Sequence, residues 1–168
     1  TEVVLNRRRL TTGAWRPTVD VFVTCCGEPI DIIAGTLRAA RDMDGDHRTW
    51  VLDDGRSDEL RDLCADLGIG YLRRDDNAHA KAGNVNAGLA RTDGEFVVIL
   101  DADHVPSPDF LVRTLPHLAD PDVAFAQTPQ AFPAAEGLVA TGTAEAQRIF
   151  YELVCPGKNH FNAVFCVG

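Results

Sequence analysis

The chain has 168 residues, a length that fits a single domain and suffices to bury a core without disulfides or metal ions. Hydrophobic residues make up 45% of it and charged residues 24%, which is an ordinary globular composition. The net charge of −9 argues against a protein that coats nucleic acid, because phosphate binding needs a basic face.

The cysteines and the hydropathy pattern argue against a disulfide-bonded or membrane-spanning chain. The five cysteines are odd in number, irregularly spaced and without a C-x-x-C pair, which predicts reduced thiols rather than disulfides or a zinc site. No apolar run approaches the roughly 20 residues of a membrane span, and no signal-peptide pattern opens the chain. We therefore expect these residues to be soluble by themselves.

The first 18 residues are polar and contain the run Arg7-Arg8-Arg9, which indicates either a solvated tail or a basic segment facing an anionic membrane surface. Strand and helix patterns then alternate. In chain order they predict strands at 19–26, 48–55, 69–75, 95–103, 122–132 and 162–168. Between these strands they predict helices at 28–43, at 57–68, from about Ala80, at 107–120 and at 134–154. The first of these helices has Pro29 in its first turn, and the second is capped by Ser57 and ended by Gly68.

This alternation predicts an α/β fold with a mostly parallel sheet and helices on both of its faces. The last run ends at Gly168 in mid-pattern, which indicates a chain truncated at its C-terminus. In open sheets of this class, ligands bind at the carboxyl ends of the strands. The acidic residues expected at that edge are Glu28, Asp53, Asp54, Asp101 and Asp103.

Carboxylates gathered at one edge repel one another, by about 4 kcal/mol for two charges ~4 Å apart at an effective dielectric of about 20. A cation or a positive ligand would offset this repulsion. We expect the strand that ends in Asp101 to lie in mid-sheet, with Asp53 and Asp54 close to it.

The pair Asp101-x-Asp103 fits Mg²⁺ or Mn²⁺, which take one or two carboxylates and leave other positions to water and phosphates. The intervening residue lets both side chains emerge on one side of a strand. A pair of helix-capping or turn aspartates is an equally good interpretation, since so short a motif occurs often.

Two further segments have both a structural and a functional interpretation. Asp53-Asp54-Gly55 is either a turn with a capping aspartate or a carboxylate pair that accepts hydrogen bonds from a nucleotide base or ribose. Lys81, which follows His79 at a helix start, is either a surface lysine or a cation that contacts a diphosphate.

Six segments in order are distinctive as a set: VDVFVTCCGEP, VLDDG, HAKAGNVNAGL, VVILDADHVPSPDFL, AQTPQAF and NAVFCVG. Together they resemble the family 2 glycosyltransferases of the GT-A (Rossmann-like) fold, and most of all the catalytic domains of bacterial cellulose synthases. The resemblance covers residues 17–168, nearly the whole chain. It implies a polar segment at 1–18 and a partial nucleotide-sugar-binding domain at 19–168.

The resemblance also implies a reaction and roles for residues. The family transfers a hexose, typically glucose from UDP-glucose, to a growing β-glycan with inversion at the anomeric carbon. A Mg²⁺ or Mn²⁺ ion neutralises charge on the departing nucleoside diphosphate. By this resemblance the site residues are Asp103 as metal ligand, Asp101 near the ribose and the metal, His104 beside the metal, Asp53 and Asp54 at the uridine, Glu28 near the uracil, and Lys81 near the nucleotide.

The sequence departs from the family pattern in two ways. Cys26-Gly27 stands where the family usually has Tyr-Asn, so the aromatic side chain that would pack on the uracil is missing. The Thr-Glu-Asp motif with the general base and the Gln-x-x-Arg-Trp motif for the acceptor do not occur before Gly168. We expect no catalytic base within the chain, weak donor and metal binding, and no polymer synthesis by these residues alone.

The family implies that the parent protein is embedded in the membrane, with this domain at its cytoplasmic face and a glycan as acceptor. Two alternatives remain open at this point. A haloacid-dehalogenase-like phosphatase would use Asp101 as nucleophile and Asp103 as acid/base, although that motif usually ends the first strand. A nucleotide-binding module without activity is the other alternative.

Overall fold

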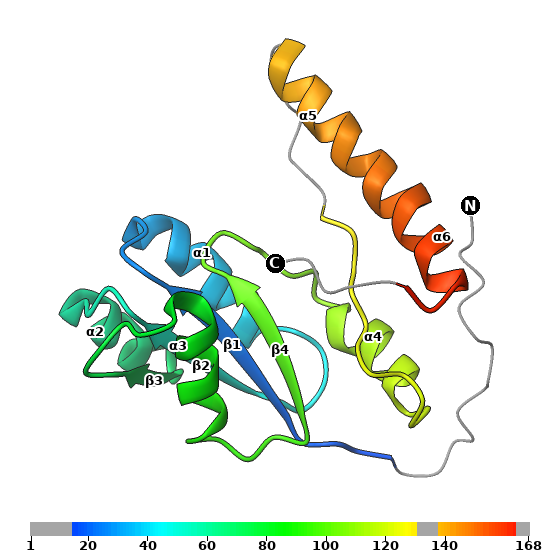
Figure 1. Ribbon diagram of the computed structural model, residues 1–168. Coiled ribbons are helices and arrows are strands. Elements are labelled where there is room, and N and C mark those ends of the chain that lie inside the picture. The colour runs from blue at the N-terminus through cyan, green and yellow to red at the C-terminus, as the bar shows by residue number, and fades with distance from the viewer. Residues whose placement is uncertain (1–14, 131–137, 164–168) are drawn as a thin grey trace. The chain divides into compact units, whose positions relative to one another are not determined.

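The computed structural model describes residues 15–130 and 138–163, and the chain divides into two compact units, one of residues 12–112 and one that begins at residue 113. The first unit alternates strands and helices (Figure 1). Its elements are β1 (Val19–Cys25), α1 (Ile30–Arg41), β2 (Arg48–Asp53), α2 (Asp58–Leu67), β3 (Gly70–Arg73), α3 (Ala80–Leu89) and β4 (Phe96–Asp101).

The four strands form one parallel sheet in the order β3-β2-β1-β4. This confirms the predicted α/β class. The expectation that β4 lies in mid-sheet is wrong for the part of the chain that the structure describes, because β4 pairs with β1 on one side and is the outermost strand. All four strands run in the same direction, so their carboxyl ends meet at one edge of the sheet.

Strand β1 is buried along its whole length because helices cover both faces of the sheet. Right-handed connections from β1 to β2 and from β2 to β3 place α1 and α2 on one face of the sheet. The connection from β3 to β4 runs back across the sheet in the opposite direction, so α3 lies on the other face (Figure 1). The largest apolar side chains that this leaves fully buried are Val19, Val21, Phe22, Val23, Leu37, Val51, Leu52, Leu60 and Leu111.

The amino edge of the sheet is held by Asp20, whose carboxylate is fully buried. It accepts hydrogen bonds from the Arg48 guanidinium at 3.0 and 3.2 Å, from the Trp50 indole N–H at 2.9 Å and from the Gly94 backbone N–H at 2.6 Å. These contacts tie β1 to β2 and to the loop that leads into β4.

The predicted caps of α2 are confirmed. The Ser57 hydroxyl accepts a hydrogen bond from the Leu60 N–H at 3.1 Å, and Gly68 ends the helix in the left-handed conformation with φ of 68°. In α1, Pro29 occupies the N-cap position just before the helix rather than its first turn.

The second unit is helical over α5 (Leu138–Ile149), the π-helix η1 (Phe150–Val154) and α6 (Cys155–His160), with α4 (Phe110–Leu118) crossing the boundary at residue 113. The helix predicted to end at residue 154 therefore continues to His160. Pro156 explains the π turn before it, since proline lacks an N–H and its ring crowds the carbonyl four residues back.

The predicted strand at 122–132 is wrong over residues 122–130, which form a turn followed by irregular structure. Alternation of apolar and polar residues determines which side chains of a strand would share a face, but a strand also needs a neighbouring strand to pair with. In addition, Pro129 has no backbone N–H to donate to such a neighbour. Residues 131–132, most of the predicted strand at 162–168 and the Arg7-Arg8-Arg9 run lie outside the described residues. Within the described part, no helix combines the length and the apolar character needed to cross a membrane.

The role of Asp20 predicts a large stability loss for Asp20→Ala. Removing the carboxylate leaves the half-buried Trp50 and Gly94 donors without this acceptor and empties a fully buried position, so we expect the free energy of unfolding in urea to fall by about 2–3 kcal/mol. The matched control is Asp46→Ala, whose carboxylate is 94% exposed, and it should change stability by less than about 0.5 kcal/mol. Equal losses in the two variants would contradict this account of Asp20.

Candidate functional site

The carboxyl edge of the sheet brings most of the predicted site residues together. In the strand register, Cys25 of β1 lies opposite Asp53 of β2, and the adjacent Thr24 lies opposite Asp101 of β4. Asp53 and Asp101 are therefore separated by one intervening strand, or about 10 Å between backbones. The loops that follow these strands carry Glu28, Asp54, Asp103 and His104.

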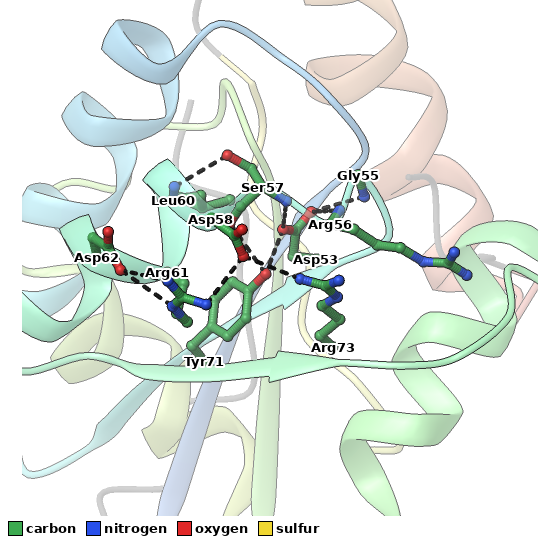
Figure 2. Close-up of polar contacts among 10 residues, drawn as sticks. All are labelled: Asp53, Gly55, Arg56, Ser57, Asp58, Leu60, Arg61, Asp62, Tyr71 and Arg73. Atoms are coloured by element: carbon green, nitrogen blue, oxygen red, sulfur yellow. Dashed lines mark hydrogen bonds and ion pairs between the residues drawn. The ribbon is translucent and has the colours of Figure 1, made fainter.

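The Asp53 carboxylate is buried and accepts hydrogen bonds from its own loop and from Tyr71 of β3, as Figure 2 shows. One oxygen accepts from the backbone N–H of Gly55 at 2.7 Å and of Arg56 at 3.0 Å. The other accepts from the Ser57 N–H and the Tyr71 hydroxyl, both at 2.7 Å. The contacts of Asp53 are those of a turn aspartate that shapes the loop between β2 and α2.

Asp54 is buried as well, but its carboxylate is held by a charged partner. Arg74 donates to both carboxylate oxygens, from Nε at 2.6 Å and from Nη2 at 2.7 Å, and both side chains are less than 10% exposed. The Asp54 backbone is fixed too, because its N–H donates to the Cys25 carbonyl and its carbonyl accepts from the Asn77 amide. This bidentate pair fixes the orientation of Asp54.

Asp101 forms the second ion pair of the edge. Its carboxylate accepts from Lys81 Nζ at 2.5 Å and lies 3.4 Å from the Thr24 hydroxyl. Burial alone would raise the pKa of Asp101, but the Lys81 hydrogen bond and charge, with smaller contributions from His104 and Thr24, lower it below its ordinary value. The carboxylate is therefore ionised at neutral pH and about one third exposed.

Asp103 follows in the turn after β4 and is 72% exposed. The imidazole of His104 lies between the two carboxylates, with Nδ1 3.7 Å from Asp101 and Nε2 3.9 Å from Asp103. Across residues 15–130 and 138–163, no three His, Cys, Asp or Glu side chains gather closely enough to hold a metal ion by themselves. The donor set matches a cation that takes one or two carboxylates and receives its other ligands from water and phosphate.

The loop after β1 contains Glu28, whose carboxylate accepts from the backbone N–H of Cys26 at 2.6 Å. Gly27 between them has φ of 100°, a conformation that favours glycine. The thiols of Cys25, Cys26, Cys64 and Cys155 are free. Burial raises the pKa of Cys25 strongly and that of Cys64 to about 12, so these two thiols are protonated at neutral pH.

Two residues of this edge were missed by reasoning from the sequence. Arg74 is the partner of Asp54, and Tyr71 is a partner of Asp53. Both come from β3 or the residue after it, and the carboxyl end of a parallel strand can present basic or phenolic side chains to this edge as well as acidic ones. The pair Arg73-Arg74 was the signal that could have found one of them.

Comparisons with known proteins agree on a family. The sequence profile of glycosyl transferase family 2 matches residues 20–166. The cellulose synthase catalytic subunit (UDP-forming) of Pseudomonas fluorescens strain SBW25 is 43% identical over 161 residues, which is 90% of this chain and 22% of that protein. The subunit of the same name from Xanthomonas axonopodis pv. citri strain 306 is 39% identical over 98% of this chain and 24% of its own length. The chain thus spans about a quarter of these curated relatives.

Solved structures agree with the fold. The mannosyltransferase PcManGT from Pyrobaculum calidifontis, in complex with GDP-Man and Mn²⁺, matches with a TM-score of 0.58 and 26% identity over 65% of this chain and 34% of that one. The four-stranded parallel sheet flanked by helices is therefore of the GT-A kind.

The contact between Tyr71 and Asp53 predicts a pH-dependent effect of Tyr71→Phe. Burial and then the hydrogen bond to Asp53 raise the pKa of Tyr71 to about 12, above the ordinary value of about 10. The stabilisation by the neutral phenol is thus complete below pH 10 and is lost as the pH rises through 12.

In urea titrations, Tyr71→Phe should be less stable than the parent chain by about 1–2 kcal/mol at pH 7. The difference should shrink between pH 10 and 12. A difference that does not change over this interval would contradict the assignment of the phenol proton to the Asp53 contact.

Proposed function

This chain belongs to glycosyl transferase family 2, and on that basis we propose that residues 19–168 form the donor-binding part of a processive, inverting glycosyltransferase. The donor is a UDP-sugar, the transferred group is a hexose and most simply glucose, and the acceptor is a growing β-glycan. One observation carries the proposal: two ion-paired carboxylates and one exposed carboxylate stand at a single sheet edge.

The nucleoside end of the donor is assigned to Asp54 and Glu28. Uracil and ribose offer N–H and O–H donors, which a fixed carboxylate accepts with geometric selectivity. Asp54 suits this role because Arg74 holds its carboxylate in a fixed orientation, whereas the oxygens of Asp53 already accept three hydrogen bonds from the loop itself and one from Tyr71 of β3. We therefore assign Asp53 to shaping the loop that presents Asp54. The UDP-forming activity in the names of the bacterial relatives supports uridine as the base.

The diphosphate end is assigned to Lys81, Asp101 and Asp103. Lys81 offers a cation to the phosphate oxygens, and Asp101 holds its ammonium group in place. Asp103, with its exposed carboxylate, and His104 beside it would hold Mg²⁺ or Mn²⁺ together with Asp101. When bound, the metal supplies charge neutralisation for the departing nucleoside diphosphate.

The remaining parts of the function concern the whole protein. Because the chain spans about a quarter of its relatives, polymer synthesis, the catalytic base, the glycan acceptor and a position at the cytoplasmic face of a membrane are proposals for the protein that contains it. The phosphatase alternative loses its support, since the chain belongs to a family of sugar transferases.

The metal assignment predicts the behaviour of Asp103→Ala. By calorimetry, UDP should bind the parent chain more tightly with Mn²⁺ than without it, and Asp103→Ala should abolish this gain. Folding should be unaffected because the Asp103 side chain is 72% exposed.

Asp46→Ala is the matched control, since Asp46 precedes β2 at the opposite edge of the sheet and its side chain is 94% exposed. It should retain the full metal effect. No binding of UDP by the parent chain in the presence of Mn²⁺ would refute the proposed donor site.

A further inference from the structure

Arg74 does more than balance the charge of Asp54. Its side chain is 9% exposed, and besides the two bonds to Asp54 it donates to the backbone carbonyls of Ala78 at 2.7 Å and Ala80 at 3.0 Å. One guanidinium therefore joins a site carboxylate to the turn that leads into α3.

That turn has an unusual backbone. His79 has φ of 62° and Ala80 has φ of 45°, and neither is a glycine, so both conformations are unfavourable in isolation. The carbonyls that Arg74 binds belong to Ala78 and Ala80, one on each side of His79. The next residue is Lys81, whose ammonium group reaches Asp101. The guanidinium thus stabilises the turn that directs Lys81.

Gly83 shows how closely the guanidinium is seated against α3. A Cβ atom at this position would overlap the Ala78 carbonyl oxygen and lie 2.6 Å from Arg74 Nη1. The contact between Arg74 and the first turn of α3 therefore needs a residue without a side chain here.

We propose that Arg74 is a positioning residue that couples the two ends of the donor site, Asp54 for the nucleoside and Lys81 for the diphosphate. This inference rests on the proposed function and deepens it. The geometry depends on the planar fork of arginine, which binds two carboxylate oxygens and two carbonyls at once. A lysine at this position keeps the charge but cannot make this set of bonds.

The binding test compares Arg74→Gln and Arg74→Lys with Arg73→Gln, which removes the neighbouring, 43% exposed guanidinium. With Mn²⁺ present, both Arg74 variants should bind UDP roughly tenfold more weakly or worse, the equivalent of about 1.4 kcal/mol, while Arg73→Gln stays near the parent. Parent-like binding by Arg74→Lys would overturn the proposal, because charge alone would then suffice.

Coupling between the two ends of the donor site can be tested with a double variant and with a ligand that lacks the diphosphate. If Arg74 acts through Lys81, the double variant Arg74→Gln/Lys81→Gln should bind UDP no more weakly than the weaker of the single variants. Uridine, which lacks the diphosphate, should lose less affinity than UDP on Arg74→Gln. Fully additive losses would overturn the coupling and leave Arg74 as a support of Asp54 alone.

Gly83→Ala would displace the Ala78 carbonyl that Arg74 binds while keeping both charges, so it tests whether the geometry of this turn matters for the donor. It should weaken UDP binding, whereas Gly35→Ala, a helical glycine with open space around its Cβ position, should not. Equal affinities in the two alanine variants would count against the proposal.

A measurement without ligand separates this inference from the proposed function. In Arg74→Gln, or in Arg74→Lys if the former does not fold, backbone amides of residues 79–82 should exchange hydrogen roughly tenfold faster or more, while those of β1 keep their protection. Unchanged exchange in the turn would refute the positioning role. If the parent chain binds no UDP with Mn²⁺, the proposed function fails, and the exchange result still decides whether Arg74 orders the turn before Lys81.

Discussion

Three carboxylates at one edge of a parallel sheet impose the constraint on which the rest of this edge depends. Each is compensated in a different way. Asp53 is buried among neutral donors, Asp54 is clamped by Arg74, and Asp101 is paired with Lys81. Because burying a carboxylate without hydrogen-bond donors or a charge partner costs free energy, the loops after β2 and β3 and the start of α3 bring such groups to them.

The different partners of the three carboxylates also suit them to different roles at this edge of the sheet. In the proposed function, Asp53 acts on a ligand only through the shape of its loop, because its oxygens already accept hydrogen bonds from that loop and from Tyr71 of β3. Asp54 is fixed in direction by a bidentate partner, which suits the recognition of base and ribose donors. The pair of Lys81 with Asp101 is about one third exposed, so its cation can be shared with an incoming anion.

Much of the first unit was predictable because the signals are local. The caps at Ser57 and Gly68 lie beside the helix that they define, and parallel strands force their carboxyl ends to one edge. The partners of the carboxylates were not predictable, since Asp54 meets Arg74 only once β2 and β3 are paired in register. The predicted strand at 122–132 is wrong over residues 122–130 for a related reason, because an alternating sequence pattern does not determine whether another strand lies beside it.

The protein's own cations already offset part of the negative charge at this edge. Repulsion among the carboxylates does not require a metal ion, because Arg74 and Lys81 already offset Asp54 and Asp101. In the proposed function, the need for a metal comes from the diphosphate of the donor. Asp53 is held by neutral donors and Asp103 is mostly exposed, so the edge stays acidic after its ion pairs are formed. In the proposed function, the diphosphate would therefore be repelled unless a divalent cation accompanied it, and the exposed carboxylate of Asp103 is the one that we assign to that cation.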